Sequence, residues 1–69
     1  MQEINSKFIS TGKFLKDFAG TTQEASPDTA NLVTGSSIFE VDTGRAYFYD
    51  AASGKFINPN TGNERGQDD

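Results

Sequence analysis

Residues 35–58 constrain the fold of this chain more than any other part, because they hold most of its strand-forming side chains. Two short runs rich in aromatic and β-branched residues flank the turn signal Asp42-Thr43-Gly44. A second turn signal ends at Gly54 and precedes a third such run. Five of the chain's eight aromatic residues, three Phe and two Tyr, lie in this window. This order of runs and turns predicts a three-stranded antiparallel meander over residues 37–58.

Alternation of side chains along these runs predicts two distinct faces of the sheet. With Thr43-Gly44 as a two-residue loop, Asp42 lies opposite Arg45, and the second turn places Asp50 opposite Lys55. The face that we expect to form the core carries Phe39, Val41, Ala46, Phe48 and Ile57. The opposite face carries Ile38, Glu40, Tyr47, Tyr49 and Phe56.

The aromatic cluster on this second face has two interpretations. The N-terminal segment can cover it with Phe14 and Phe18, or it can form a contact surface for another chain, since Tyr is enriched at protein interfaces. The residues that we predict for such an interface are Ile38, Tyr47, Tyr49, Phe56, Phe14 and Phe18.

Residues 1–19 form a separate N-terminal arm or edge strand. Phe14, Leu15 and Phe18 fit the spacing of a helical turn, and alternation of Phe14 with Phe18 across Lys16 also fits a strand. Gly12 argues against one continuous helix. We therefore expect a strand over 13–19, at the edge of the meander and covering its apolar face, which gives a mostly β fold of three to four antiparallel strands.

Two further segments lack strand patterns. Residues 20–36 read as a polar connector, in which Leu32 and Val33 are the strongly apolar residues and are expected to anchor the loop beneath the sheet. Residues 59–69 contain no apolar side chain besides proline. Such a segment buries too little to offset its ordering entropy, so we expect a disordered tail.

Composition excludes several classes of function. The 69 residues include no Cys and no His, which removes disulfides, thiolate zinc sites and the commonest general base. A domain this small has a marginal core, so association with another chain is the expected supplement. The net charge of −4 argues against nucleic acid as a partner. No apolar run is long enough for a membrane span, and the polar start resembles no signal peptide, so synthesis in a cytoplasm is expected.

The sequence Asp42-Thr43-Gly44 resembles the Asp-Thr-Gly of aspartic proteases, in which two carboxylates share one proton. This chain carries a single copy, is too short for that framework, and places Arg45 beside the aspartate. A hairpin turn, where glycine supplies a positive φ, is the favoured interpretation. We expect no enzyme activity, no cofactor and no metal site.

The stretch from Gly35 to Asp50, with its Gly-Ser, its alternating strand, Asp-Thr-Gly-Arg and a closing Tyr-Asp, resembles a small module of tailed-phage and prophage structural genes. The likeness covers roughly residues 20–57 and includes Gly20 to Ala25 and Pro27 in the connector. It departs at Phe56, where the module often has Trp.

That resemblance implies a small virion accessory protein, a capsid decoration or fibre-associated piece made in the host cytoplasm and located in the virion. Its implied partners are a capsid or other virion protein, bound non-covalently in many copies or as a homo-oligomer, with neither nucleic acid nor membrane involved. Two alternatives stay open. One is a phage-encoded cytoplasmic adaptor or inhibitor that binds a host protein, and the other is a carbohydrate-contacting module that uses exposed tyrosines.

Overall fold

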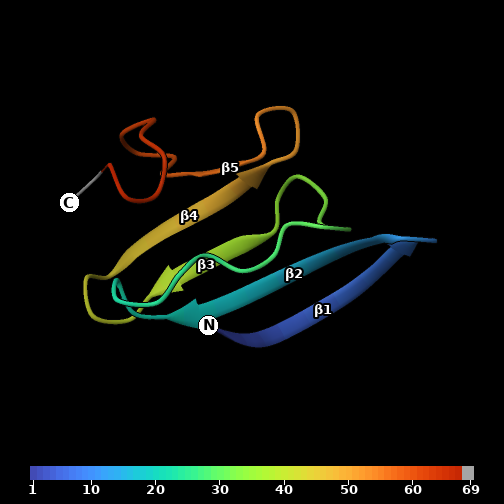
Figure 1. The fold of residues 1–69 in the computed structure, drawn as a ribbon, viewed down its shortest axis with the longest axis horizontal. Helices are drawn as coiled ribbons and strands as arrows, with labels where there is room; N and C mark the ends of the chain where they lie inside the picture. The colour runs from blue at the N-terminus through green and yellow to red at the C-terminus, as the bar shows by residue number, and fades with distance from the viewer. Residues whose placement is uncertain (68–69) are drawn as a thin grey trace.

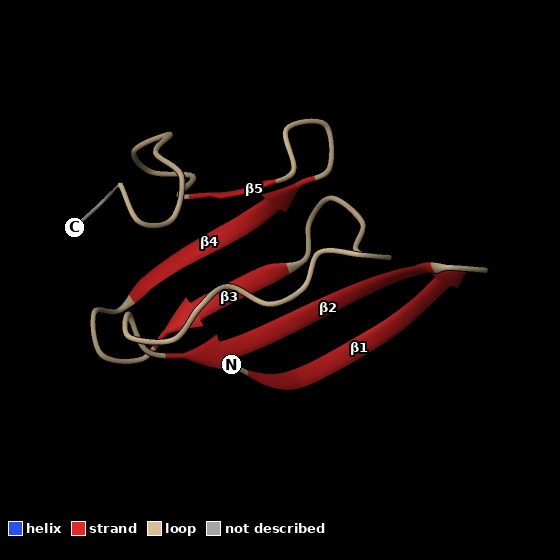
Figure 2. Cartoon of the chain, in the orientation of Figure 1, coloured by secondary structure: helices blue, strands red, loops and turns tan. Residues whose placement is uncertain are grey.

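The computed structural model describes residues 1–67 as one five-stranded sheet in the order β1-β2-β3-β4-β5 (Figure 1). The strands are β1 Gln2–Ser10, β2 Lys13–Gly20, β3 Ser37–Glu40, β4 Arg45–Asp50 and β5 Lys55–Ile57. The described part of the chain contains strands, turns and loops and no helix (Figure 2). The predicted mostly β class is confirmed.

The N-terminal arm is a long antiparallel hairpin. β1 and β2 pair from Gln2 opposite Ala19 to Ser10 opposite Lys13, with irregularities at two points in β1. The turn uses Thr11 and Gly12, and Gly12 has a φ of +75°. The predicted strand over 13–19 is confirmed as β2. Its predicted place was wrong, because β2 lies within the sheet between β1 and β3 and does not cover a face of the meander. The terminal strand is β1, which was not predicted.

β2 joins the meander in parallel, which corrects the expectation of an all-antiparallel sheet. Its second half pairs with β3 from Asp17 opposite Ser37 to Gly20 opposite Glu40. Parallel neighbours need a crossover, and residues 21–36 supply it by running back across one face of the sheet (Figure 1). Such crossovers are right-handed in nearly all proteins, so this pairing decides which face the connector covers.

The register of the β3–β4 hairpin differs from the prediction by two residues. Glu40, and not Asp42, lies opposite Arg45, so the loop has four residues instead of two. Val41 leaves the hairpin because its N–H donates to the Gly20 carbonyl at 2.9 Å. A shift of two residues keeps every side chain on its predicted face. The predicted register of β4 with β5 is confirmed, with Asp50 opposite Lys55.

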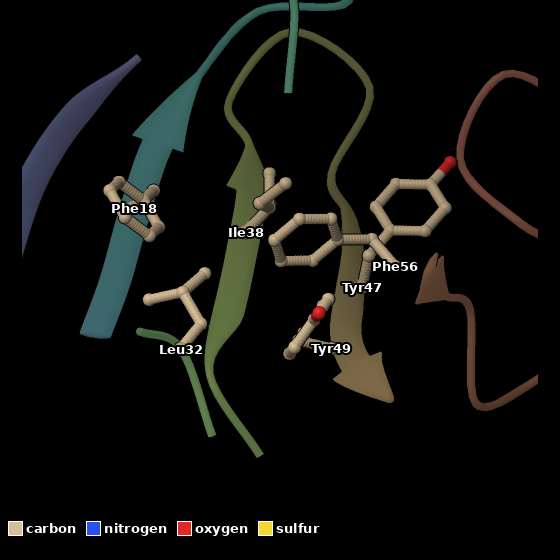
Figure 3. Close-up of a cluster of buried hydrophobic side chains, with 6 residues drawn as sticks. All are labelled: Phe18, Leu32, Ile38, Tyr47, Tyr49 and Phe56. Atoms are coloured by element: carbon tan, nitrogen blue, oxygen red, sulfur yellow. The ribbon is translucent and has the colours of Figure 1, made fainter. Parts of the chain in front are cut away.

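The assignment of the core to one of the two faces was wrong. The buried cluster lies on the face that we call the inner face, and consists of Phe18, Leu32, Ile38, Tyr47, Tyr49 and Phe56 (Figure 3). The face expected to be the core, which we call the outer face, leaves Phe39 and Phe48 each 45% exposed. Both faces are apolar in sequence, and the connector, which inserts Leu32, closes the inner one.

The predicted disordered tail is wrong for residues 59–67, and residues 68–69 lie outside the described part. The chain turns after Asn58 and returns beside β5, where Glu64 forms a bridge with Ile57. The Arg65 N–H donates to the Phe56 carbonyl at 2.8 Å. Polar side chains and backbone hydrogen bonds order this segment. A prediction of disorder from low apolar content takes no account of such interactions.

Because the core lies on the inner face, truncating adjacent side chains of β4 should destabilise the fold to very different extents. We expect Tyr47→Ala, at a side chain with no exposed area, to cost roughly 3–5 kcal/mol, enough to unfold so small a domain. Phe48→Ala on the outer face should cost about 1 kcal/mol. Urea unfolding followed by circular dichroism measures both, and a larger loss in Phe48→Ala would contradict the assignment of the faces.

Candidate interaction surfaces

The structure places five of the six predicted interface residues in the core. Ile38 and Tyr47 have no exposed area, and Phe18, Tyr49 and Phe56 are at most 7% exposed. Tyr49 and Phe56 pack with ring centroids 5.2 Å apart. The interpretation in which the N-terminal segment covers this cluster is supported for Phe18. A carbohydrate surface made of exposed tyrosines is excluded by this burial.

Phe14 has a different setting from the other five. It is half-buried, outside the core cluster, and its ring meets that of Phe8 edge-on at a centroid distance of 5.7 Å. The Lys16 ammonium lies 5.4 Å from the Phe14 centroid and forms an ion pair with Glu3 at 3.0 Å. The two strands of the hairpin thus hold each other through their own inner-face side chains.

Arg65 joins three parts of the chain over the inner face. Its Nε donates to Glu40 Oε2 at 2.8 Å, and Nη1 donates to Ser26 Oγ at 2.9 Å. Nη2 donates to the carbonyls of Thr21 at 3.0 Å and Glu24 at 2.9 Å. The side chains of Arg65 and Glu40 are only 10% and 3% exposed, so solvent screens the pair weakly. No local sequence pattern predicts this clamp, because its partners are 25 to 44 residues apart in the chain.

Three successive turns share one pattern, in which a Glu, Asp or Asn stands four residues before a glycine. The glycine N–H donates to that residue's carbonyl at 2.8 Å in each case, from Gly44 to Glu40, Gly54 to Asp50 and Gly62 to Asn58. The three glycines have φ values of +74°, +72° and +77°, which other residues adopt at a cost. Gly44 and Gly54 therefore define turns as predicted. The same pattern in residues 58–62 was the available signal that the tail is ordered.

Asp42 and Thr43 both stabilise the first of these turns. The Thr43 hydroxyl donates to Glu40 Oε1 at 2.8 Å, so both carboxylate oxygens of Glu40 accept hydrogen bonds. The Thr22 hydroxyl donates to Asp42 Oδ2 at 2.7 Å, and the Thr22 N–H lies 3.2 Å from both Asp42 oxygens. The hydrogen bond from the Thr22 hydroxyl holds the pKa of Asp42 below its ordinary value of 3.8. The Asp-Thr-Gly motif thus ties the hairpin to the connector.

The outer face of the central strands carries several apolar side chains that remain accessible. The register places Ala19, Phe39 and Ala46 in one cross-strand row, and Phe48 beside Ile57 in the next. Phe39 and Phe48 are each 45% exposed, and Val41 in the adjoining turn is 59% exposed. These side chains form a candidate docking surface.

The two edges of the sheet differ. The return after β5 pairs with that strand, since the Asn58 N–H donates to the Asn63 carbonyl at 2.8 Å and Arg65 bonds to Phe56. β1 is the opposite terminal strand, and all nine of its residues are exposed. Its outward backbone groups are therefore open to pairing with a further strand.

Within residues 1–67, no three His, Cys, Asp or Glu side chains gather in a way that could hold a metal ion. The same range contains no helix with the length and apolar character needed to span a membrane. The features of the described chain with a clear binding geometry are thus the outer face and the β1 edge.

Removing Arg65 should destabilise the protein strongly, because it leaves the Glu40 carboxylate buried without its partner. We expect Arg65→Ala to lose roughly 3–5 kcal/mol of the free energy of unfolding. Lys55→Ala, which removes the more exposed ion pair of Lys55 with Glu64, is the control and should lose less than about 1 kcal/mol. Equal losses in urea unfolding would show that Arg65 does not act as a clamp.

Asp42 should make stability depend on pH in the acid range. Since its folded pKa is lowered, the carboxylate stabilises the fold above the ordinary value of 3.8, and this contribution disappears as pH falls through the folded pKa. The stability difference between the wild type and Asp42→Asn should therefore be constant above about pH 5 and shrink below that. Thr22→Val, which removes the donating hydroxyl, should reduce this pH dependence. A difference that stays constant down to pH 2 would contradict the assignment.

Comparison with known proteins identified no relative of this chain. No protein-family model, curated protein or solved structure matches this chain.

Proposed function

We infer that this chain is a small accessory protein of a phage virion, which binds a larger structural protein non-covalently and in several copies through its outer face. One observation carries the proposal: Phe39 and Phe48 remain 45% exposed on the face of the sheet opposite the closed core. Exposed aromatic side chains grouped on a sheet face are typical of protein-binding sites.

The geometry suits docking without rearrangement. Phe39 and Phe48 stand on neighbouring strands, β3 and β4, which are fixed by the core on the other side. Aromatic side chains on rigid strands lose little conformational entropy when a partner covers them. A domain of this size also has a marginal core, and the area buried on a larger partner stabilises it.

The class of partner rests on the resemblance of residues 35–50 to modules of phage structural genes. The docking residues change from those expected from sequence, because the tyrosines of the inner face are in the core. The contact surface that we propose consists of Ala19, Phe39, Val41, Ala46, Phe48 and Ile57. We propose binding, and not catalysis, as the role of this surface.

The proposal predicts loss of particle binding when the two outer-face aromatics are removed. Tagged wild type and the double variant Phe39→Ser, Phe48→Ser are produced during infection, and particles are purified on a density gradient. We expect the variant's occupancy to fall at least about ten-fold, since buried aromatic anchors dominate such interfaces. Occupancy is measured by quantitative mass spectrometry of the purified particles.

Phe8→Ser is the matched control, because it makes the same change at an exposed Phe of β1, 62% accessible, that lies beside Phe14 on the inner side. Its occupancy should equal that of the wild type. Wild type that is absent from particles would contradict the virion role. A single stoichiometric host protein captured from lysate, lost in the double variant, would then favour the host-binding alternative.

A further inference from the structure

We propose that β1 is a self-association edge, at which two copies of this chain pair antiparallel around a two-fold axis centred on Ser6. The two five-stranded sheets then form one continuous sheet of twice the width. This inference concerns the edge of the sheet and not its outer face, so it stands independently of the proposed virion role.

The first support is the asymmetry between the two edges. Residues that follow β5 return to pair with it, whereas β1 is nine residues long, exposed throughout and terminal in the sheet (Figure 1). Natural sheets usually shorten or cover their edge strands, because open backbone groups recruit further strands. In this chain the longest strand is the one left open.

The second support is a regular window in the middle of β1. The pairing of β1 with β2 is irregular between Glu3 and Asn5 and between Phe8 and Ser10, and it is continuous from Asn5 to Phe8. Within this window, Ser6 and Phe8 lie opposite Lys16 and Phe14 on the inner side. Asn5 and Lys7 therefore lie on the outer side. A strand that adds to β1 must match this alternation.

The charges of β1 disfavour most registers in which a second copy could pair with it. Parallel pairing in register sets Glu3 against Glu3 and Lys7 against Lys7, and like charges directly opposite each other are destabilising. Antiparallel pairing centred on Lys7 again opposes the two lysines. Pairing centred on Asn5 opposes Glu3 and Lys7, which project from different faces of the strand.

Centring the pair on Ser6 avoids these conflicts. Asn5 then faces Lys7 of the second copy on the outer side, and Ser6 faces Ser6. Ile4 faces Phe8 of the second copy at each end, and these two side chains are 60% and 62% exposed in the single chain. Pairing thus adds backbone hydrogen bonds and covers apolar surface that the fold leaves open.

The absence of cysteine makes the register directly measurable. Each of Ser6→Cys, Lys7→Cys and Ser10→Cys introduces one thiol in β1, and Ser53→Cys introduces one in an exposed turn as the collision control. Opposed residues of antiparallel strands have Cα atoms about 4.5–5.5 Å apart, which a disulfide spans. Under mild oxidation of the full chain, Ser6→Cys should form covalent dimer at least about ten-fold faster than Ser53→Cys.

A charge series tests the same contact without a covalent bond. Ser6→Lys should weaken self-association roughly five-fold in sedimentation equilibrium, and an equimolar mixture with Ser6→Glu should restore it. Ser10→Lys, which faces Gln2 of the second copy, should behave as the wild type. Circular dichroism verifies that each variant is folded.

The proposal is overturned if Ser6→Cys dimerises no faster than Ser53→Cys, or if Lys7→Cys is the fastest variant. It is also overturned if Ser6→Lys associates as the wild type does. Two measurements separate the two proposals. Ser6→Lys retains Phe39 and Phe48, so it should still bind particles. The double variant Phe39→Ser, Phe48→Ser retains β1, so it should still self-associate.

Discussion

The ion pair between Arg65 and Glu40 is the interaction on which the arrangement of this small sheet depends. A carboxylate that is 3% exposed needs a partner, and Arg65 supplies it from 25 residues away. The same guanidinium bonds to the carbonyls of Thr21 and Glu24, so the connector and the C-terminal segment are held over one face together. The fold closes one side of the sheet with loops, in place of the second sheet or the helices that larger domains use.

Closing one side leaves two accessible surfaces, which would bind a partner through different kinds of interaction. The outer face offers Phe39 and Phe48 for apolar burial, which is non-directional and adapts to a partner's shape. The β1 edge offers backbone groups, whose hydrogen bonds are directional and specify register. A face and an edge can be occupied at the same time.

Local sequence signals predicted a large part of this fold. Gly44 and Gly54 marked two turns, and the register of β4 with β5 was right. The β3–β4 register was wrong by two residues, since Val41 bonds to Gly20 and the loop is longer than predicted. The side chains of each face were nevertheless grouped correctly, because a shift of two preserves alternation. The candidate site was misplaced, since the grouping does not say which face is covered.

The sequence by itself determined where the strands and turns of the meander lie and which side chains share a face. These properties depend on a period of two residues and on glycines that adopt a positive φ, both local in the chain. Only the tertiary structure decided that β2 pairs in parallel with β3, that the connector covers the tyrosines, and that Arg65 ties the C-terminal segment to the connector. Those outcomes rest on contacts between residues 20 to 44 apart, such as Asp17 with Ser37 and Arg65 with Thr21, and a local pattern carries no record of such partners.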